Sequence, residues 1–237
     1  MDISQLISKK VSSFFNNVST FSNTDVNAIY SKLTRRDNHL INIFINDLQN
    51  SLIYSNFDIH FSGSTFLLLF IINNHIITSN IGDSRAILIS NNSIIPLSSD
   101  HKPLLPREKE RIEKNNGVTR KEYPDGPDRV WCQNENFPGI AMSRSMGDLV
   151  AKEIGVSNEE EISIREISKN DKYIVLASDC LWDNVDNGTV KQIVDGLYLK
   201  NDAKGAVYAL IEEASRRFEE QNEARDDITV IVYFFNH

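Results

Sequence analysis

Residues 65–78 read TFLLLFIINNHIIT, which is two apolar runs joined by a pair of asparagines. Apolar runs of this length are typical of buried strands, and asparagine is favoured in tight turns because it tolerates a positive φ. Residues 86–97, AILISNNSIIPL, repeat the arrangement around a second Asn-Asn pair. The two segments together predict an antiparallel meander of short strands.

Helices are expected on both sides of these strands. Apolar residues at helical spacing predict three helices within residues 1–57, with Thr24-Asp25 and Asp37-Asn38 as N-caps of the second and third. The third helix is expected over about residues 40–52. Further along, the pattern predicts helices at about 106–115, 188–198 and 202–220, and strands at 173–178 and 228–235. This order of elements predicts the α+β class with a mainly antiparallel sheet.

The composition is that of an ordinary globular protein. The chain has 237 residues and 27.0 kDa, with 41% hydrophobic and 24% charged residues, which excludes a disordered, collagen-like or coiled-coil protein. No repeat or linker divides the sequence, so residues 1–237 are expected to form one domain. The net charge of −8 argues against nucleic-acid binding and leaves divalent cations or basic partners open.

Membrane spans, secretion and disulfides are not expected. No apolar run approaches the roughly 18 residues of a membrane span, and the first residues, MDISQ, lack the layout of a signal peptide. Only Cys132 and Cys180 are present, which is too few for a disulfide framework and fits a reducing compartment. We therefore expect an intracellular protein, in the cytoplasm or nucleus, without membrane association.

Acidic residues stand at the ends of several apolar runs. Four segments share this placement: GDSR (82–85), SRSMGD (143–148), SDCLWD (178–183) and RDDIT (225–229). Mg²⁺ and Mn²⁺ prefer oxygen ligands, so carboxylates from separate strand ends are the expected construction of a site for these ions. Two such ions can clamp a phosphoryl group and activate water. A single Asp can equally form a turn, cap a helix or make an ion pair, and Asp148 and Asp227 fit that simpler interpretation best.

Seven strings follow one another along residues 61–235. They are FSGST (61–65), NIGDSRA (80–86), SDHKP (99–103), E-x-x-RI (108–112), PGIAMSRSMGD (138–148), ASDCLWD (177–183) and DDITV (226–230). In this order and spacing they closely resemble the metal-dependent serine/threonine protein phosphatases of the 2C type. The resemblance implies an α-β-β-α sandwich, in which two antiparallel sheets pack together with helices outside and a binuclear Mg²⁺/Mn²⁺ site at one end.

The same resemblance suggests which residues hold metal ions. Asp179 and Asp226 match the family's ligands of the metal pair. Asp83 and Asp183 match residues of an additional, weaker metal position, although Asp83 could instead simply hold its turn. No catalytic residue is assigned by the resemblance.

Other segments have expected supporting roles. Residues 1–57 are expected to form a helical lead-in. The Gly/Pro/Asp-rich stretch of about 113–137 is expected to be a long surface excursion, and the resemblance makes it the counterpart of the family's variable flap. His101 is expected to organise a loop. Arg85 and Arg144 are expected to tie loops together through carboxylates or carbonyls.

The sequence departs from the family pattern at three places. The family's first metal motif, Asp-Gly-His-Gly-Gly, does not occur, and about three N-terminal strands and the phosphate-binding Arg are expected to be missing with it. Cys180 replaces a Gly of the family, and a Cys would strain that turn if the position requires a positive φ. Asp227 replaces an Asn and adds negative charge beside Asp226.

Two main functional hypotheses follow. The first is hydrolysis of phosphoserine and phosphothreonine in proteins, by a water that two Mg²⁺ or Mn²⁺ ions activate. The second is a catalytically inactive pseudophosphatase that binds a protein partner or regulates it, which the absent motif favours. A third, weaker hypothesis is a domain that senses Mg²⁺ or Mn²⁺ without turnover. The expected partner is a phosphoprotein substrate in the first case and a protein partner in the second.

Overall fold

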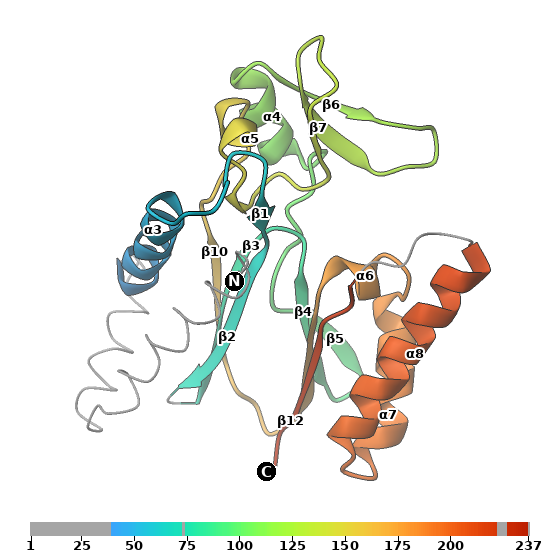
Figure 1. The fold of residues 1–237 in the computed structure, drawn as a ribbon. Coiled ribbons are helices and arrows are strands. Elements are labelled where there is room, and N and C mark those ends of the chain that lie inside the picture. Colours follow the sequence, from blue (N-terminus) through green and yellow to red (C-terminus); the bar gives the residue numbers. More distant parts are fainter. Residues whose placement is uncertain (1–38, 73, 222–226, 237) are drawn as a thin grey trace. The chain divides into compact units, whose positions relative to one another are not determined.

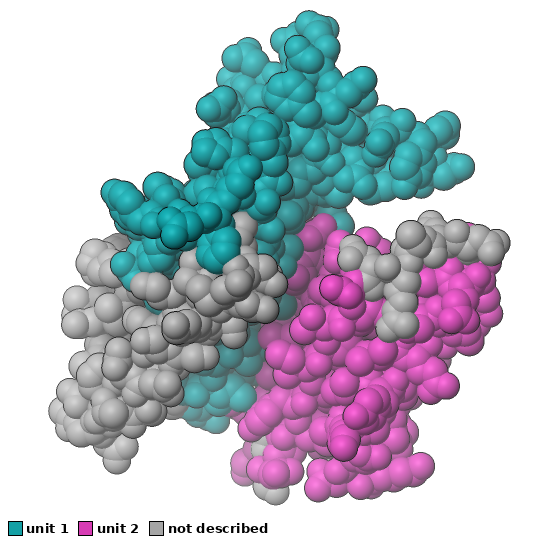
Figure 2. Space-filling view, viewed as in Figure 1, with its two compact units in different colours: residues 1–82, 101–164 teal, residues 83–100, 165–237 magenta. Residues whose placement is uncertain are grey.

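The computed structural model describes residues 39–72, 74–221 and 227–236 (Figure 1). The first two helices expected from the sequence, and both expected N-caps, lie outside these residues. Contacts divide the chain into two compact units, which Figure 2 shows in different colours. Unit 1 comprises residues 1–82 and 101–164, and unit 2 comprises residues 83–100 and 165–237.

A three-stranded sheet and a long helix form one part of unit 1. The sheet has the order β10-β3-β2 and consists of β2 (Phe66–Ile72), β3 (His75–Ile81) and β10 (Glu161–Glu166), of which residues 161–164 belong to unit 1. Helix α3 (His39–Ile53) confirms the third predicted helix. Asn74 has a φ of 62° in the turn between β2 and β3, as the Asn-Asn pair predicted. The buried cluster between helix and sheet comprises Phe44, Ile45, Leu48, Leu52, Ile59, Phe66, Ile77, Ile81 and Met146.

The remaining elements of unit 1 include a second small sheet. They are β1 (Gly63–Ser64), α4 (Pro106–Lys114), β6 (Gly117–Lys121), β7 (Asp128–Cys132), β8 (Pro138–Ile140), β9 (Met146–Gly147) and α5 (Leu149–Glu153). Strands β6, β7 and β8 form an antiparallel sheet where the sequence predicted only a surface excursion. One aromatic residue anchors it: the Trp131 indole N–H donates to the Arg120 carbonyl at 3.0 Å, and the Arg120 guanidinium lies 4.4 Å from the ring centre.

Unit 2 is built on a four-stranded antiparallel sheet of order β12-β11-β4-β5. Its strands are β4 (Arg85–Ser90), β5 (Ser93–Pro96), β11 (Asp171–Ala177) and β12 (Val230–Phe234). The predicted buried strand is β11, and it lies between β12 and β4. Helices α7 (Asn187–Tyr198) and α8 (Ala203–Gln221) pack on one face of this sheet (Figure 1). The short helix α6 (Asp179–Trp182) follows β11 directly.

Alternate residues of the strands form the core of unit 2. Residues of β4 and β11 that point to the helices are fully buried, among them Ile87, Ile89 and Val175. Tyr173 lies in the same row, and its hydroxyl donates to the Asp195 carboxylate of α7 at 2.8 Å. The hydrogen bond satisfies the one polar atom of a fully buried ring, so the sheet and α7 are joined without an unpaired group.

The predicted meander is wrong, although both hairpins are present. β2 and β3 belong to one sheet, whereas β4 and β5 belong to the other. The reason lies in long-range pairing: β3 has β10 as its second neighbour, and β4 has β11. Both edges of each strand are therefore used, and β3 cannot also pair with β4. The predicted α+β class with antiparallel sheets is confirmed.

None of the described helices has the length and apolar character needed to cross a membrane.

Candidate active site

Asp179 stands where β11 gives way to α6. β11 ends at Ala177, and Ser178 is the N-cap of α6. The Ser178 N–H donates to the Thr229 carbonyl at 3.1 Å, and the Thr229 N–H donates to Ser178 Oγ at the same distance. This reciprocal pair fixes the segment after Asp226 against the start of α6. Asp226 itself lies outside the described residues, so its pairing with Asp179 stays a prediction.

Cys180 causes no backbone strain at this position. It is the second residue of α6 and is absent from the described residues with positive φ. Its N–H donates to Asp179 Oδ1 at 3.0 Å, and its Sγ lies 3.5 Å from the same oxygen. Cys180 is buried, so the thiol occupies space that the family's Gly would leave open. The condition under which Cys180 would strain the turn is therefore not met.

Asp83 and Asp183 both lie within the electrostatic reach of Arg85. The Arg85 guanidinium donates Nε and Nη2 to the two oxygens of Asp100, at 2.9 and 2.6 Å. Hydrogen bonding to Asp100 raises the pKa of Arg85, and the charges of Asp183 and Asp83 raise it further. Asp83 is buried, whereas Asp183 is exposed. The structure thus gathers two of the four predicted metal residues around one cation.

Arg85 is held on two further sides. Its Nη1 donates to Asn187 Oδ1 at 3.0 Å, at the beginning of α7. Its guanidinium carbon lies 5.2 Å from the centre of the Trp182 ring. Because Arg85 and Trp182 come from β4 and α6, this contact links the segments that carry Asp83 and Asp183. The expectation that Arg85 ties loops through carboxylates is confirmed.

The described carboxylates are oxygen donors of the kind that a hard cation prefers, but no three of the described donor side chains lie together. Within residues 39–72, 74–221 and 227–236, no three His, Cys, Asp or Glu side chains are grouped so that they could hold one ion. Structural sites for Mg²⁺ and Mn²⁺ use several oxygen ligands. Asp226, which the sequence predicts as a ligand of the metal pair, lies outside the described residues.

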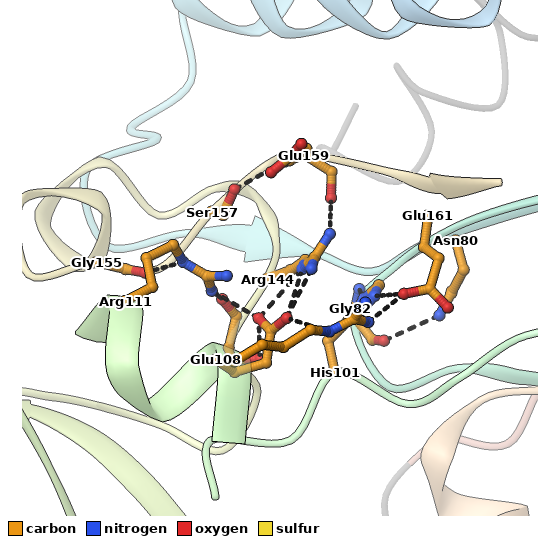
Figure 3. Close-up of polar contacts among 12 residues, drawn as sticks. Asn80, Gly82, His101, Glu108, Arg111, Arg144, Gly155, Ser157, Glu159 and Glu161 are labelled. Carbon is orange, nitrogen blue, oxygen red and sulfur yellow. Dashed lines mark hydrogen bonds and ion pairs between the residues drawn. The ribbon is translucent and has the colours of Figure 1, made fainter. Parts of the chain in front are cut away.

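A buried carboxylate organises the loops of unit 1 (Figure 3). Glu108 of α4 is fully buried, and it accepts hydrogen bonds from Arg144 Nη2 at 2.6 Å, Arg111 Nη2 at 2.7 Å and Ser143 Oγ at 2.9 Å. Arg107 Nε lies 3.2 Å from the same carboxylate. Burial by itself raises the pKa of Glu108, but these hydrogen bonds and charges lower it to about 2.

Sequence reasoning did not identify this cluster as a unit. The E-x-x-R spacing of residues 108–111 places two side chains on one helix face, which was the available signal. Arg144 was expected to tie loops together, and its contacts confirm this. Ser143 and Arg144 are 35 residues or more from Glu108 in the sequence, so no local pattern predicts that they contact it.

His101 organises the turn between β3 and Asp83, as expected. Its N–H donates to the Gly82 carbonyl at 3.0 Å, and the Gly82 N–H donates to His101 Nδ1 at 3.0 Å. The imidazole is fully buried. Burial lowers the pKa of His101 to about 4, and the positive charge of Arg144 lowers it in the same direction. His101 is therefore neutral near pH 7, and because Nδ1 accepts a hydrogen bond the proton is assigned to Nε2.

Asp148 is a buried group of unit 1. It precedes α5 with a φ of 49°, and burial raises its pKa. Lys152 lies nearby on α5, donates Nζ to the Ser145 carbonyl at 2.8 Å, and has a pKa that burial lowers to about 8. Asp227 is exposed and its carbonyl accepts a hydrogen bond from Ser178 Oγ at 3.4 Å. Neither carboxylate belongs to a described metal-binding group.

The stability of the protein should fall as the pH drops from about 6.5 to 4. The pKa of His101 is about 4 in the folded chain and 6.5 in the unfolded chain. Between these values the unfolded chain binds more protons than the folded chain, and this proton binding favours unfolding. The loss is roughly 3 kcal/mol for His101. Below pH 4.5, Glu108 adds a further loss because its folded pKa is about 2. Urea unfolding at a series of pH values measures the slope, and His101→Asn should flatten it between pH 6.5 and 4; an unchanged slope in that variant contradicts the assignment.

Comparison with known families places the chain in one of them. The family model of protein phosphatase 2C matches residues 3–222, which is most of the chain. The chain therefore belongs to the protein phosphatase 2C family. The solved serine-threonine phosphatase 2C from Toxoplasma gondii has a similar fold, with a TM-score of 0.77 at 21% identity, over 98% of this chain and 78% of that one.

Curated relatives give the same family at higher identity. Probable protein phosphatase 2C 52 of Arabidopsis thaliana is 35% identical over 192 residues, which are 77% of this chain and 40% of that protein. Probable protein phosphatase 2C 61 of Arabidopsis thaliana is also 35% identical, over 74% of this chain and 55% of that protein. The chain thus spans about half the length of these relatives.

Proposed function

We propose that this chain carries out Mg²⁺- or Mn²⁺-dependent hydrolysis of phosphoserine and phosphothreonine in proteins. The observation that carries the proposal is the position of Asp179 at the end of β11, with the segment after Asp226 bonded to the neighbouring Ser178. Asp226 precedes this bonded segment in the sequence, and the proposal is that its carboxylate joins that of Asp179 at the end of β11, in a member of the protein phosphatase 2C family.

The proposal gives each carboxylate a role. Asp179 and Asp226 hold the metal pair, and Asp83 and Asp183 hold an additional ion. When bound, such ions supply a Lewis acid for the phosphoryl oxygens and an activated water. The positive charge of Arg85, which is held in place by bonds to Asp100 and Asn187, attracts both Asp83 and Asp183. The proposed substrate is a phosphoprotein, and the proposed location is the cytoplasm or nucleus.

A second candidate function is a pseudophosphatase that binds or regulates a protein partner. Two observations favour it. The sequence has Cys180 in place of the family's Gly beside Asp179, and Asp227 in place of an Asn beside Asp226. Both candidates predict the same fold, so they differ only in turnover and in metal binding.

Phosphate release decides between them. Wild-type protein should hydrolyse p-nitrophenyl phosphate and a phosphothreonine peptide in millimolar Mn²⁺, and EDTA should abolish the reaction. The Asp179→Ala/Asp226→Ala double variant should fall to the rate without enzyme, because both ligands of the metal pair are removed. Asp227→Asn is the matched control and should retain turnover, since it changes the adjacent exposed residue.

The opposite result has an equally clear meaning. If folded, monodisperse wild-type protein releases no phosphate from either substrate, the proposed hydrolysis is wrong for this chain and the pseudophosphatase is supported. Turnover that persists unchanged in the double variant contradicts the assigned carboxylates.

A further inference from the structure

Two consecutive residues hold the turn that carries Asp83. Asp100 binds the Arg85 guanidinium through both carboxylate oxygens, at 2.9 and 2.6 Å. His101 makes two hydrogen bonds to Gly82, each of 3.0 Å: its backbone N–H donates to the Gly82 carbonyl, and its ring Nδ1 accepts the Gly82 N–H. Asp83 lies between Gly82 and Arg85 in the chain, so the residues on either side of it are held by Asp100-His101.

Gly82 has a left-handed backbone conformation and a buried N–H that needs a hydrogen-bond acceptor. Its φ is 102°, and a Cβ at this position would lie 2.6 Å from Thr65 Cγ2. Gly82 is buried, so its N–H has no access to solvent and would cost free energy if it were left without an acceptor. The neutral Nδ1 of His101 is that acceptor. A residue without an acceptor at this place leaves the Gly82 N–H unsatisfied and removes one of the hydrogen bonds that hold the turn, while those to the Gly82 carbonyl from the His101 N–H and Asn80 Nδ2 remain.

His101 is itself held in one orientation. Its carbonyl accepts the Ser143 N–H at 2.8 Å, and Ser143 Oγ donates to the buried Glu108 carboxylate. On the other side of the ring, Nε2 faces Glu161 Oε2 at 3.7 Å. The backbone of His101 is thus fixed by Ser143, and the ring lies between Gly82 at Nδ1 and Glu161 at Nε2.

We propose that His101 is a positioning residue for Asp83, which fixes the carboxylate for a divalent cation by accepting the Gly82 N–H. This inference deepens the proposed function and rests on it, because it assumes that Asp83 contributes to cation binding. His101 contacts neither cation nor substrate in this role. It acts through the Gly82 backbone, with Asp100 holding Arg85 on the far side of the same turn.

Two substitutions separate this role from general packing. His101→Leu is close in size but removes the acceptor, whereas His101→Asn can place its Oδ1 where Nδ1 lies. His60→Leu serves as a control, since His60 is an exposed histidine of the same unit with a side chain 66% accessible. Thermal unfolding of each variant establishes that the folded state is compared.

Nuclear magnetic resonance gives a readout that needs neither metal nor turnover. The wild type should show a scalar coupling across the hydrogen bond between the Gly82 nitrogen and His101 Nδ1, and slow exchange of the Gly82 amide. Exchange should accelerate in His101→Leu and stay slow in His101→Asn. Absence of the coupling in the wild type overturns the proposal, whatever the other variants do.

Mn²⁺ titration, followed by electron paramagnetic resonance, tests the link to Asp83. Positioning groups behind a metal ligand change affinity by about 10–100-fold, so His101→Leu should weaken Mn²⁺ binding by about tenfold and His101→Asn should restore most of it. Equal affinity of wild type and His101→Leu overturns the positioning role while the proposed function stands. Absence of Mn²⁺ binding by the wild type contradicts the proposed function, and the inference then falls with it.

Discussion

Replacing Glu108 by alanine should lower the free energy of unfolding by about 3–5 kcal/mol. The carboxylate is fully buried and accepts hydrogen bonds from Arg111, Ser143 and Arg144. Arg144 is buried as well, with a side chain only 7% accessible. Removal of the carboxylate leaves a buried guanidinium without its counter-charge, which costs more than the pair itself contributes. Urea denaturation followed by circular dichroism measures the change.

A matched substitution on the same helix isolates this effect. Glu110 of α4 is exposed and pairs with Lys114 at 2.8 Å, so Glu110→Ala should leave the free energy of unfolding nearly unchanged. Glu108→Gln keeps the shape and loses the charge, and it should fall between wild type and Glu108→Ala. Equal and small effects for all three variants would show that the cluster does not stabilise the fold.

Gly147→Ala should lower the free energy of unfolding by about 3 kcal/mol. Gly147 has a φ of 80°, and a Cβ there would lie 2.4 Å from the Ser62 carbonyl oxygen. The Ser62 carbonyl also accepts the Asp148 N–H at 2.9 Å, so the backbone cannot move aside without losing that bond. The strain of a left-handed alanine and the backbone clash therefore add. The same urea experiment measures the loss.

Gly196 provides the opposite expectation from the same substitution. It lies within α7, is exposed, and a Cβ there has nothing within 4 Å. Gly196→Ala should raise the free energy of unfolding by about 0.5–1 kcal/mol, because alanine loses less backbone entropy in a helix. If both variants shift stability in the same direction, the conformational argument at Gly147 is wrong.

Local patterns predicted the elements well wherever one physical cause dominated. The Asn-Asn pairs predicted both hairpin turns, because a turn with positive φ favours Asn, and Asn74 and Asn91 adopt it. Helical spacing predicted α3, α7 and α8, since each buries one apolar face. Strands β6, β7 and β8 were missed because they are short and carry many charged or polar residues, and one buried Trp131 anchors them.

The candidate site divides along the same line. Residue type and motif placed Asp83, Asp179 and Asp183 among the functional candidates, and the structure shows Asp83 and Asp183 around Arg85. The relation of Asp179 to Asp226 remains a prediction from the sequence. Cys180 would strain its turn only at a positive φ, and the sequence does not specify φ there. The structure shows that Cys180 lies in helix α6 without a positive φ.

Short-range propensity and residue chemistry specify the α+β class, the two hairpins and the carboxylates at strand ends, so these could be read from the sequence. Three features became visible only in the folded chain: the hairpins lie in different sheets, His101 accepts the Gly82 N–H, and Glu108 accepts hydrogen bonds from Arg111, Ser143 and Arg144. Apart from Arg111, which lies on the same helix as Glu108, the partners in these contacts are 19 or more residues apart in the sequence. Such contacts are selected by the packing of the whole chain, since a buried donor or charge must find its partner wherever the fold brings one.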